Sequence, residues 1–135
     1  MSEQKPLDIE IINKCAVVRF IRPEKKNPLS VETLEILDEN FAELNSNKKI
    51  KIIIFTGSGN TFAAGAHLNE VAELNEKTAI DFGLLGQNLM QKIYHSNKMT
   101  IAAIDGFCMG GALDLALSCN VRIASERAVF AHPGA

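Results

Sequence analysis

Two glycines and one carboxylate stand close together in residues 104–117, IDGFCMGGALDLAL. Gly110 and Gly111 precede an amphipathic segment, and Asp114 follows one helical turn later among apolar neighbours that predict its burial. The first N–H groups of a helix have no partner inside the helix and carry partial positive charge. Glycine has no Cβ and lets another group approach such amides. The stretch therefore predicts a site where backbone amides bind a negatively charged oxygen.

A second loop of small residues, Ala63-Ala64-Gly65-Ala66, follows another apolar stretch and offers a further amide. Two amides directed at one oxygen form an oxyanion hole, in which each donor lowers a reaction barrier by ~2.7–4 kcal/mol. A structural alternative stays open at both places. The paired glycines could serve only a tight strand-to-helix crossing, and the AAGA loop could serve only close packing.

Composition narrows the class of protein. The 135 residues are enough for one domain with a core, and 47% are hydrophobic. A net charge of −2 provides no basic surface for nucleic acid or an anionic membrane. No apolar run approaches the ~20 residues that a membrane-spanning helix needs. Cys15, Cys108 and Cys119 lack metal-like spacing and, with the polar start MSEQKPLDIE, predict reduced thiols in a cytoplasmic protein without a metal site.

The elements that must position these loops alternate between strands and helices. Residues 7–13 and 15–21 are predicted to form a β-hairpin, followed by a basic loop with two prolines. Ser30 is a good N-cap for a helix whose apolar residues recur every three or four positions up to residue 44. Residues 50–55 are almost continuously β-branched, which predicts a strand buried on both faces.

The second half of the chain continues the alternation. A short helix is expected after the AAGA loop, a longer one at 77–95, a buried strand at 99–104 and a short helix at 110–118. Short strands are expected at 121–124 and 128–131. The order of elements predicts an α/β fold with covered sheets. The expected core residues of the long helix are Ile80, Leu84, Leu85, Leu89 and Ile93.

Taken together, the segments TFAAGAHLNEV and AAIDGFCMGGALDLALSCNVRIASERAVFAHP resemble the enoyl-CoA hydratase/isomerase (crotonase) family. VVRFIRPEKKNPLSVETLEIL is similar to the family's N-terminal strand, basic loop and helix. The resemblance extends from about Ile9 to the end and implies an α/β, crotonase-like ββα spiral fold. Family members are longer, and this chain stops directly after a predicted strand. Residues 1–135 are therefore expected to form an N-terminal core without the C-terminal part of the spiral.

The resemblance also implies a substrate and a set of site residues. Family members bind an acyl-CoA thioester and stabilise its enolate, so coenzyme A would enter as part of the substrate and no separate cofactor is expected. By motif, Ala66 of AGAH and Gly111 of GGALD would supply the two oxyanion-hole amides. Ala64, Gly65 and Gly110 would line the substrate site beside them.

Position 114 carries the acid/base candidate, because many hydratases of the family have a glutamate there; a helix-surface or capping acid is the alternative. Asp114 is one methylene shorter, as in the GGxxD pattern of dienoyl-CoA isomerases, and a ~1 Å misplacement can reduce a rate 10²-fold. The second hydratase glutamate is replaced by Gly134. Hydration is therefore in doubt, and isomerisation, decarboxylation or another enolate reaction stays open. His132 could substitute as a base or be an ordinary strand-end residue, and His67 is expected to be structural or exposed.

Lys25 and Lys26 are candidates for the CoA phosphates, since the family's basic loop lies near the nucleotide end of CoA. An ordinary solvated loop is the alternative. The family also implies a homo-oligomer, either a trimer or a hexamer. Two further interpretations stay open: a catalytically silent CoA-binding or assembly fragment of this fold, and an unrelated α/β domain.

Overall fold

The computed structural model describes residues 5–65 and 75–132, beginning with the predicted hairpin. Strands β1 (Leu7–Ile12) and β2 (Cys15–Phe20) pair in antiparallel register through a two-residue turn. Asn13 in this turn has a φ of 56°, a left-handed conformation that asparagine tolerates better than most residues. The prediction of a hairpin at this place is confirmed.

Three helices of the described residues lie close to their predicted positions. Helix α1 (Val31–Ser46) begins after Ser30, whose side chain accepts the Thr33 N–H, as expected for an N-cap. Helix α3 (Glu76–Tyr94) begins one residue earlier than predicted, at an Asn75 capping box. Helix α4 (Gly111–Ser118) begins at the second glycine of the pair.

The first sheet follows the predicted alternation. Its order in the described residues is β1-β2-β3-β5-β7, with β3 at Ile52–Thr56, β5 at Met99–Ile104 and β7 at Val121–Ala124. All neighbours pair in parallel except β1 and β2. Helices return the chain between parallel strands, which is the usual crossover for such pairs.

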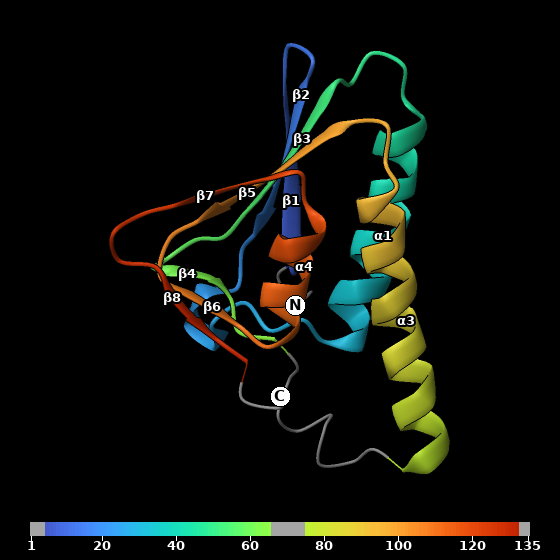
Figure 1. Cartoon of the computed structure of the whole chain (residues 1–135), viewed down its shortest axis with the longest axis vertical. Helices are drawn as coiled ribbons and strands as arrows, with labels where there is room; N and C mark the ends of the chain where they lie inside the picture. Colours follow the sequence, from blue (N-terminus) through green and yellow to red (C-terminus); the bar gives the residue numbers. More distant parts are fainter. Residues whose placement is uncertain (1–4, 66–74, 133–135) are drawn as a thin grey trace.

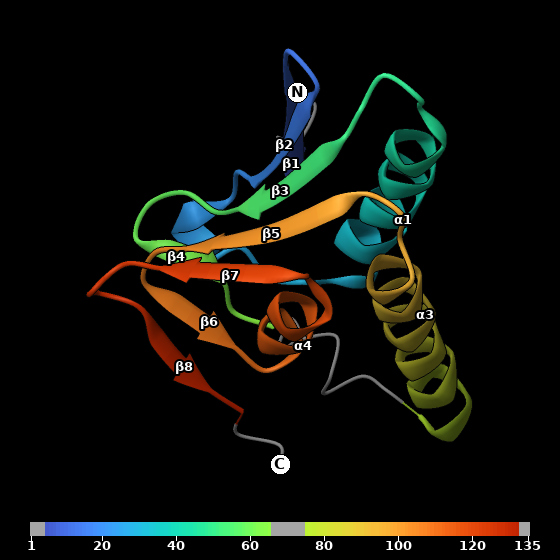
Figure 2. The same cartoon turned by 45° about the horizontal axis from the view of Figure 1, so that its top comes forward.

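A second sheet was only partly predicted. Strands β4 (Thr61–Ala63), β6 (Phe107–Met109) and β8 (Val129–Ala131) pair in parallel. From the sequence, β8 was predicted, a loop was expected at β4 and no regular element was expected at β6. The chain steps from β3 to β4, from β5 to β6 and from β7 to β8, so each of these three steps adds one strand to each sheet, whereas β1 and β2 belong to the first sheet alone (Figure 2). With the helices that follow, this is the expected ββα spiral.

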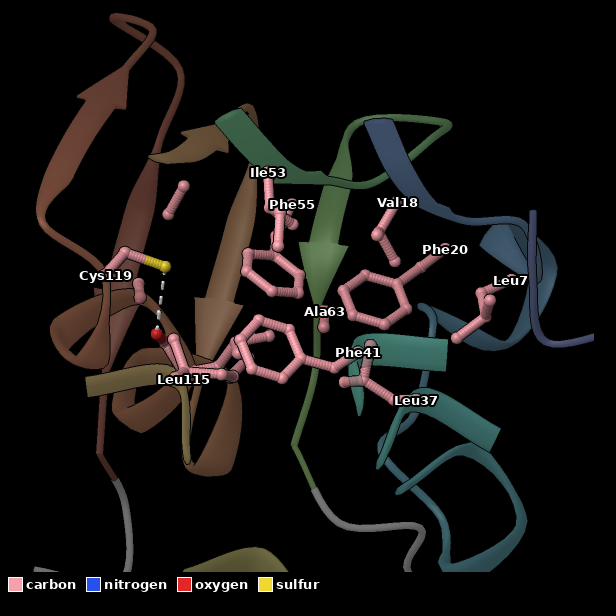
Figure 3. Close-up of a cluster of buried hydrophobic side chains, with 14 of the residues drawn as sticks. Leu7, Val18, Phe20, Leu37, Phe41, Ile53, Phe55, Ala63, Leu115 and Cys119 are labelled. Atoms are coloured by element: carbon pink, nitrogen blue, oxygen red, sulfur yellow. Dashed lines mark hydrogen bonds between the residues drawn. The ribbon is translucent and has the colours of Figure 1, made fainter. Parts of the chain in front are cut away.

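The core lies between one face of the first sheet and helices α1, α3 and α4 (Figures 1 and 2). Aromatic side chains fill its centre, where Phe41 of α1 stacks on Phe55 of β3 at 6.1 Å between ring centroids. Phe20 meets Phe62 edge-on at 5.9 Å. Figure 3 shows Leu115 and Cys119 closing the cluster from the α4 side. Burying rings of this size supplies much of the stabilisation of a small domain.

The prediction that β3 is buried on both faces is wrong. In β3, Ile53 and Phe55 are fully buried but Ile52 and Ile54 are only half-buried, because no helix of the described residues covers the outer face of this sheet. That outer face is apolar and partly exposed, with Met99, Val121 and Ile123 on it.

The long helix is also less covered than expected. Leu89 and Ile93 of α3 are buried as predicted, whereas Ile80 is 57% and Leu84 is 48% exposed. The first turns of α3 extend past α1 and α4 in Figure 1, so the apolar stripe there has no described neighbour to pack against.

Candidate active site

The two glycine-containing loops predicted from the sequence meet in space. Gly65 follows β4, and Gly110 and Gly111 follow β6, its parallel neighbour, so both loops leave the same edge of the second sheet. A Cβ placed on Gly65 would lie 2.8 Å from the Met109 carbonyl oxygen and 3.2 Å from the Gly111 nitrogen. Gly65 also has a φ of +84°. This contact between backbones requires glycine at position 65.

A buried asparagine holds the first loop in place. Asn27 is 2% exposed, and its Nδ2 donates to the Thr61 carbonyl at 3.0 Å. The backbone carbonyl of Asn27 accepts the Ala64 N–H at 3.3 Å, and the Leu29 N–H donates to the Gly65 carbonyl. No local sequence pattern identified Asn27 as part of the site. The Asn-Pro dipeptide at 27–28 marks a turn, but its hydrogen bonds reach residues more than thirty positions away.

The second loop leaves one amide without an acceptor. The Gly110 N–H donates to the Ala131 carbonyl at 2.9 Å, which ties β6 to β8. The Gly111 N–H meets no acceptor in the part of the chain that the structure describes. A Cβ on Gly111 would lie 3.9 Å from Leu29 Cδ1, which is an ordinary contact. Packing therefore does not require glycine at position 111.

A mainly apolar cavity of about 430 Å³ opens beside this amide. It lies between α3, α4 and the start of α1, and Gly83 and Gly86 of α3 each face open space where a Cβ would project. Its described lining residues are Leu29, Leu34, Phe82, Gly83, Gly86, Gln87, Met90, Gln91, Gly111 and Asp114. The α3 residues among them were not identified individually from the sequence, because helical periodicity does not distinguish a cavity wall from a core face.

Asp114 lines the cavity from the first turn of α4. Asp114 is not buried as its apolar neighbours suggested but lies on the helix surface, which was the alternative: its side chain is 52% exposed, and the buried face of α4 is formed by Ala112, Leu115 and Ala116. The Asp114 carboxylate lies 3.2 Å from Nε2 of His132, the residue after β8. Both residues were candidates from the sequence, but their contact was not predicted.

The remaining predicted site residues lie elsewhere. Lys25 ends a single 3-10 turn, η1 (Pro23–Lys25), and Lys26 places its Nζ 4.7 Å from the centroid of the Phe107 ring. Neither lysine lines the cavity. Ala66, His67 and Gly134 lie outside the described residues.

No group of three or more His, Cys, Asp or Glu side chains within residues 5–65 and 75–132 is arranged to hold a metal ion. The thiols of Cys108 and Cys119 are buried, which raises the pKa of Cys108 to about 11 and that of Cys119 to about 12. Protonated, buried thiols are poor nucleophiles. The helices of the described residues include none that is long and apolar enough to cross a membrane.

Comparison with known proteins gives consistent matches. A family model described as enoyl-CoA hydratase/isomerase matches residues 10–135. The chain is 36% identical over 126 residues to a short-chain-enoyl-CoA hydratase of Clostridium acetobutylicum, covering 93% of this chain and 48% of that protein. It is also 36% identical, over the same shares, to a crotonyl-CoA hydratase of Syntrophomonas wolfei.

Solved structures agree with the sequence matches. The crystal structure of an enoyl-CoA hydratase from Thermoplasma volcanium superposes with a TM-score of 0.91 at 34% identity, covering 96% of this chain and 52% of that one. This chain thus spans about half the length of the relatives that it matches. The ββα spiral, the order of the two glycine loops and the matched family model lead to one conclusion: the chain belongs to the enoyl-CoA hydratase/isomerase family.

Proposed function

We propose that this protein binds an acyl-CoA thioester and stabilises the thioester enolate in an oxyanion hole beside Asp114. The observation that carries the proposal is the Gly111 N–H, which lacks an acceptor among the described residues and lies at the cavity with Gly65 packed against it. A helix N-terminus favours negative charge, and the first turn of α4 would add this effect to the amide itself.

In isomerisation, and in the exchange reaction that serves as the test below, a base removes a proton from the α-carbon of the acyl group, and the electron pair of the C–H bond moves towards the thioester carbonyl. In hydration the oxygen of water bonds to the β-carbon of an enoyl group while a base takes the proton of the water, and the electron pair of the C=C bond moves towards the same carbonyl; the α-carbon is then protonated. In both reactions the carbonyl oxygen becomes negatively charged. The amide of Gly111, with that of Ala66 as the second donor, would hold this oxygen. Each such donor lowers a comparable barrier by ~2.7–4 kcal/mol. Asp114 is the carboxylate that lines the cavity within the described residues, which makes it our candidate for the proton transfers.

The cavity wall suits the acyl group rather than the nucleotide. Leu34, Phe82 and Met90 present apolar surface there, and the matched relatives include enzymes named for short-chain enoyl-CoA and crotonyl-CoA. Coenzyme A would enter as part of the substrate. Lys25 and Lys26, outside the cavity, would meet its phosphates, for which lysine is suited by charge.

Hydration and isomerisation share the enolate but differ in their need for acids and bases. Addition of water requires a group that activates the water and a proton for the α-carbon, and the sequence has Gly134 where family hydratases have their second glutamate. Double-bond isomerisation needs one group that moves a proton between two carbons. We therefore propose enolate chemistry of fatty acyl-CoA, with hydration and isomerisation as the two candidate outcomes.

The test is exchange of the α-protons of butyryl-CoA in heavy water, followed by proton NMR on the purified protein. We expect exchange above background, and we expect Asp114→Asn to abolish it while Asp105→Asn retains it. Asp105 is a suitable control because it is a similarly exposed carboxylate that pairs with Arg127 and lies outside the cavity. Absence of exchange by the wild type would refute the enolate proposal, whether or not butyryl-CoA binds.

A second candidate is an assembly or silent CoA-binding role, and the exposed apolar surface favours it. The outer face of the first sheet and the start of α3 present several large apolar side chains, a pattern typical of surfaces that meet a partner. A homo-oligomer, trimeric or hexameric by family resemblance, would cover them. Binding of butyryl-CoA without exchange would favour this second role, and light scattering would report the oligomer.

A further inference from the structure

The Asp114 carboxylate has a histidine neighbour that bridges both of its oxygens. Nε2 of His132 lies 3.2 Å from Oδ1 and 3.3 Å from Oδ2 of Asp114. An ionised carboxylate only accepts hydrogen bonds, so the nitrogen facing it carries the proton. The two side chains are 38% and 52% exposed, and pairs this exposed contribute little to the stability of a fold. Stability of the fold therefore does not explain this contact.

The backbone brings these side chains together from two different elements. His132 directly follows β8, which pairs in parallel with β6, and the Gly110 N–H donates to the Ala131 carbonyl at 2.9 Å. This hydrogen bond holds the end of β8 against the start of α4, where Asp114 lies in the first turn. Strand pairing and one backbone hydrogen bond thus place the histidine beside the acid.

Asp114 would have little orientation without this neighbour. In the described residues the hydrogen bonds of its side chain are those with His132, and an aspartate on an exposed helix face can adopt several rotamers. A general base has to lie within hydrogen-bond reach of the proton that it removes. His132 does not line the cavity, so an effect on the reaction would pass through Asp114.

We propose that His132 is a positioning residue that donates its Nε2–H to Asp114 and fixes the carboxylate at the cavity wall. This inference rests on the proposed function, because it takes Asp114 as the acid/base group. It gives the chain a partner for a carboxylate that is one methylene shorter than a glutamate.

The first experiment measures butyryl-CoA α-proton exchange in three variants of the purified protein. His132→Ala removes the donor, and we expect exchange to fall about 10- to 100-fold, the size of effect that a ~1 Å misplacement produces. Butyryl-CoA affinity and the melting temperature should not change. His132→Gln should restore most of the rate, because its amide can donate an N–H at a similar distance from the backbone. Arg127→Ala, which removes the partner of the exposed Asp105, is the matched control and should keep the wild-type rate.

Two results would overturn the inference. One is a wild-type exchange rate in His132→Ala. The other is failure of His132→Gln to recover activity, which would exclude hydrogen-bond donation as the role of the histidine. In both cases exchange by the wild type would still support the proposed function.

A second measurement is independent of activity. Imidazole ¹⁵N NMR of the wild type should show His132 protonated on Nε2 at pH values where the ring is neutral, and Asp114→Ala should shift the Nε2 resonance. An unchanged His132 spectrum in Asp114→Ala would contradict the contact itself. If the wild type shows no exchange, the proposed function fails while this spectrum still decides whether His132 holds Asp114.

Discussion

Glycine serves different purposes at the two ends of β6. At the first end, where β5 turns into β6, a Cβ on Gly106 would overlap the Asn60 carbonyl oxygen, and φ is +77°. At the second end, Gly65 is similarly confined, but Gly111 has room for a Cβ beside Leu29. We call the close approach of two backbones at each end of β6 a crossing. The first crossing, at Gly106 and Asn60, thus needs glycine to let the two backbones pass. The second crossing has a glycine that packing alone does not explain.

The hydrogen bonds of the two crossings differ in the same way. At the first crossing the Phe107 N–H donates to the Asn60 carbonyl at 3.3 Å, and the Gly106 carbonyl accepts the Val129 N–H at 2.8 Å. At the second crossing the Gly111 N–H has no acceptor in the described residues. The unpaired amide stands at a helix N-terminus and on a cavity wall, where an anion can reach it, so it is a more direct indicator of a ligand site than the glycine beside it.

The largest expected effect is on stability, at the first crossing. Gly106→Ala should reduce the free energy of unfolding by about 2–5 kcal/mol, from overpacking of ~1–3 kcal/mol and a positive-φ cost of ~1–2 kcal/mol. Urea denaturation followed by circular dichroism would measure it. A loss below about 1 kcal/mol would mean that the crossing is loose, contrary to the comparison.

Gly111→Ala should have the opposite profile. The helix would tolerate alanine and gain up to ~1 kcal/mol in stability. The new methyl group would obstruct the approach of a carbonyl oxygen to the amide, so butyryl-CoA exchange should fall about 10²–10³-fold, as when an oxyanion donor is lost. A wild-type exchange rate in Gly111→Ala, or loss of its folded state, would contradict the proposed difference between Gly111 and Gly106.

Cys108 lies in β6 between the two crossings. The pH dependence of stability that its buried thiol causes shows whether the crossings shield β6 from solvent. Burial raises the pKa of its thiol from 9.0 to about 11, so the folded protein keeps the proton at pH values where the unfolded chain loses it. This contribution to stability is fully present below pH 9 and is lost as pH rises towards 11.

The free energy of unfolding, measured in urea, should fall between pH 8 and pH 10.5 in the wild type. In Cys108→Ala this fall should be smaller by up to about 2 kcal/mol, at 1.36 kcal/mol per pH unit of pKa shift. Equal losses in both proteins would indicate that the strand opens to solvent and that the crossings do not enclose it.

The smallest effects are expected in α3, where glycine has neither role. Gly83→Ala and Gly86→Ala meet nothing within 4 Å and should each raise stability by up to ~1 kcal/mol. Their methyl groups would narrow the cavity. For α-proton exchange, kcat/KM with a long acyl-CoA should therefore fall about tenfold relative to kcat/KM with butyryl-CoA. Stabilisation without a change in chain-length preference would place the acyl group elsewhere.

Local sequence patterns predicted the elements that local interactions determine. Ser30 and the three- and four-residue spacing of apolar side chains located α1, and the hairpin followed from two short strands around Asn13. These signals lie within one element or one turn. They predicted the position of α3 equally well, although Ile80 and Leu84 proved exposed because periodicity does not tell how far a neighbour extends along a helix.

The second sheet had no comparable local pattern. β4 and β6 have three residues each, too few to show an alternation, and they pair with segments far apart in the sequence. Asn27 was missed for the same reason, since its hydrogen bonds to the 58–62 segment exist only in the folded chain. Short strands and buried polar contacts of this kind depend on tertiary pairing more than on propensity.

The sequence alone determined the family, the order of the two glycine loops and the presence of one acid a helical turn after Gly111. Only the tertiary structure decided that Gly65 touches Gly111, that this amide faces a cavity and that His132 meets Asp114. The physical reason is parallel pairing. β4, β6 and β8 end at the same edge of one small sheet, and backbone hydrogen bonds between them bring together residues that the chain separates by tens of positions.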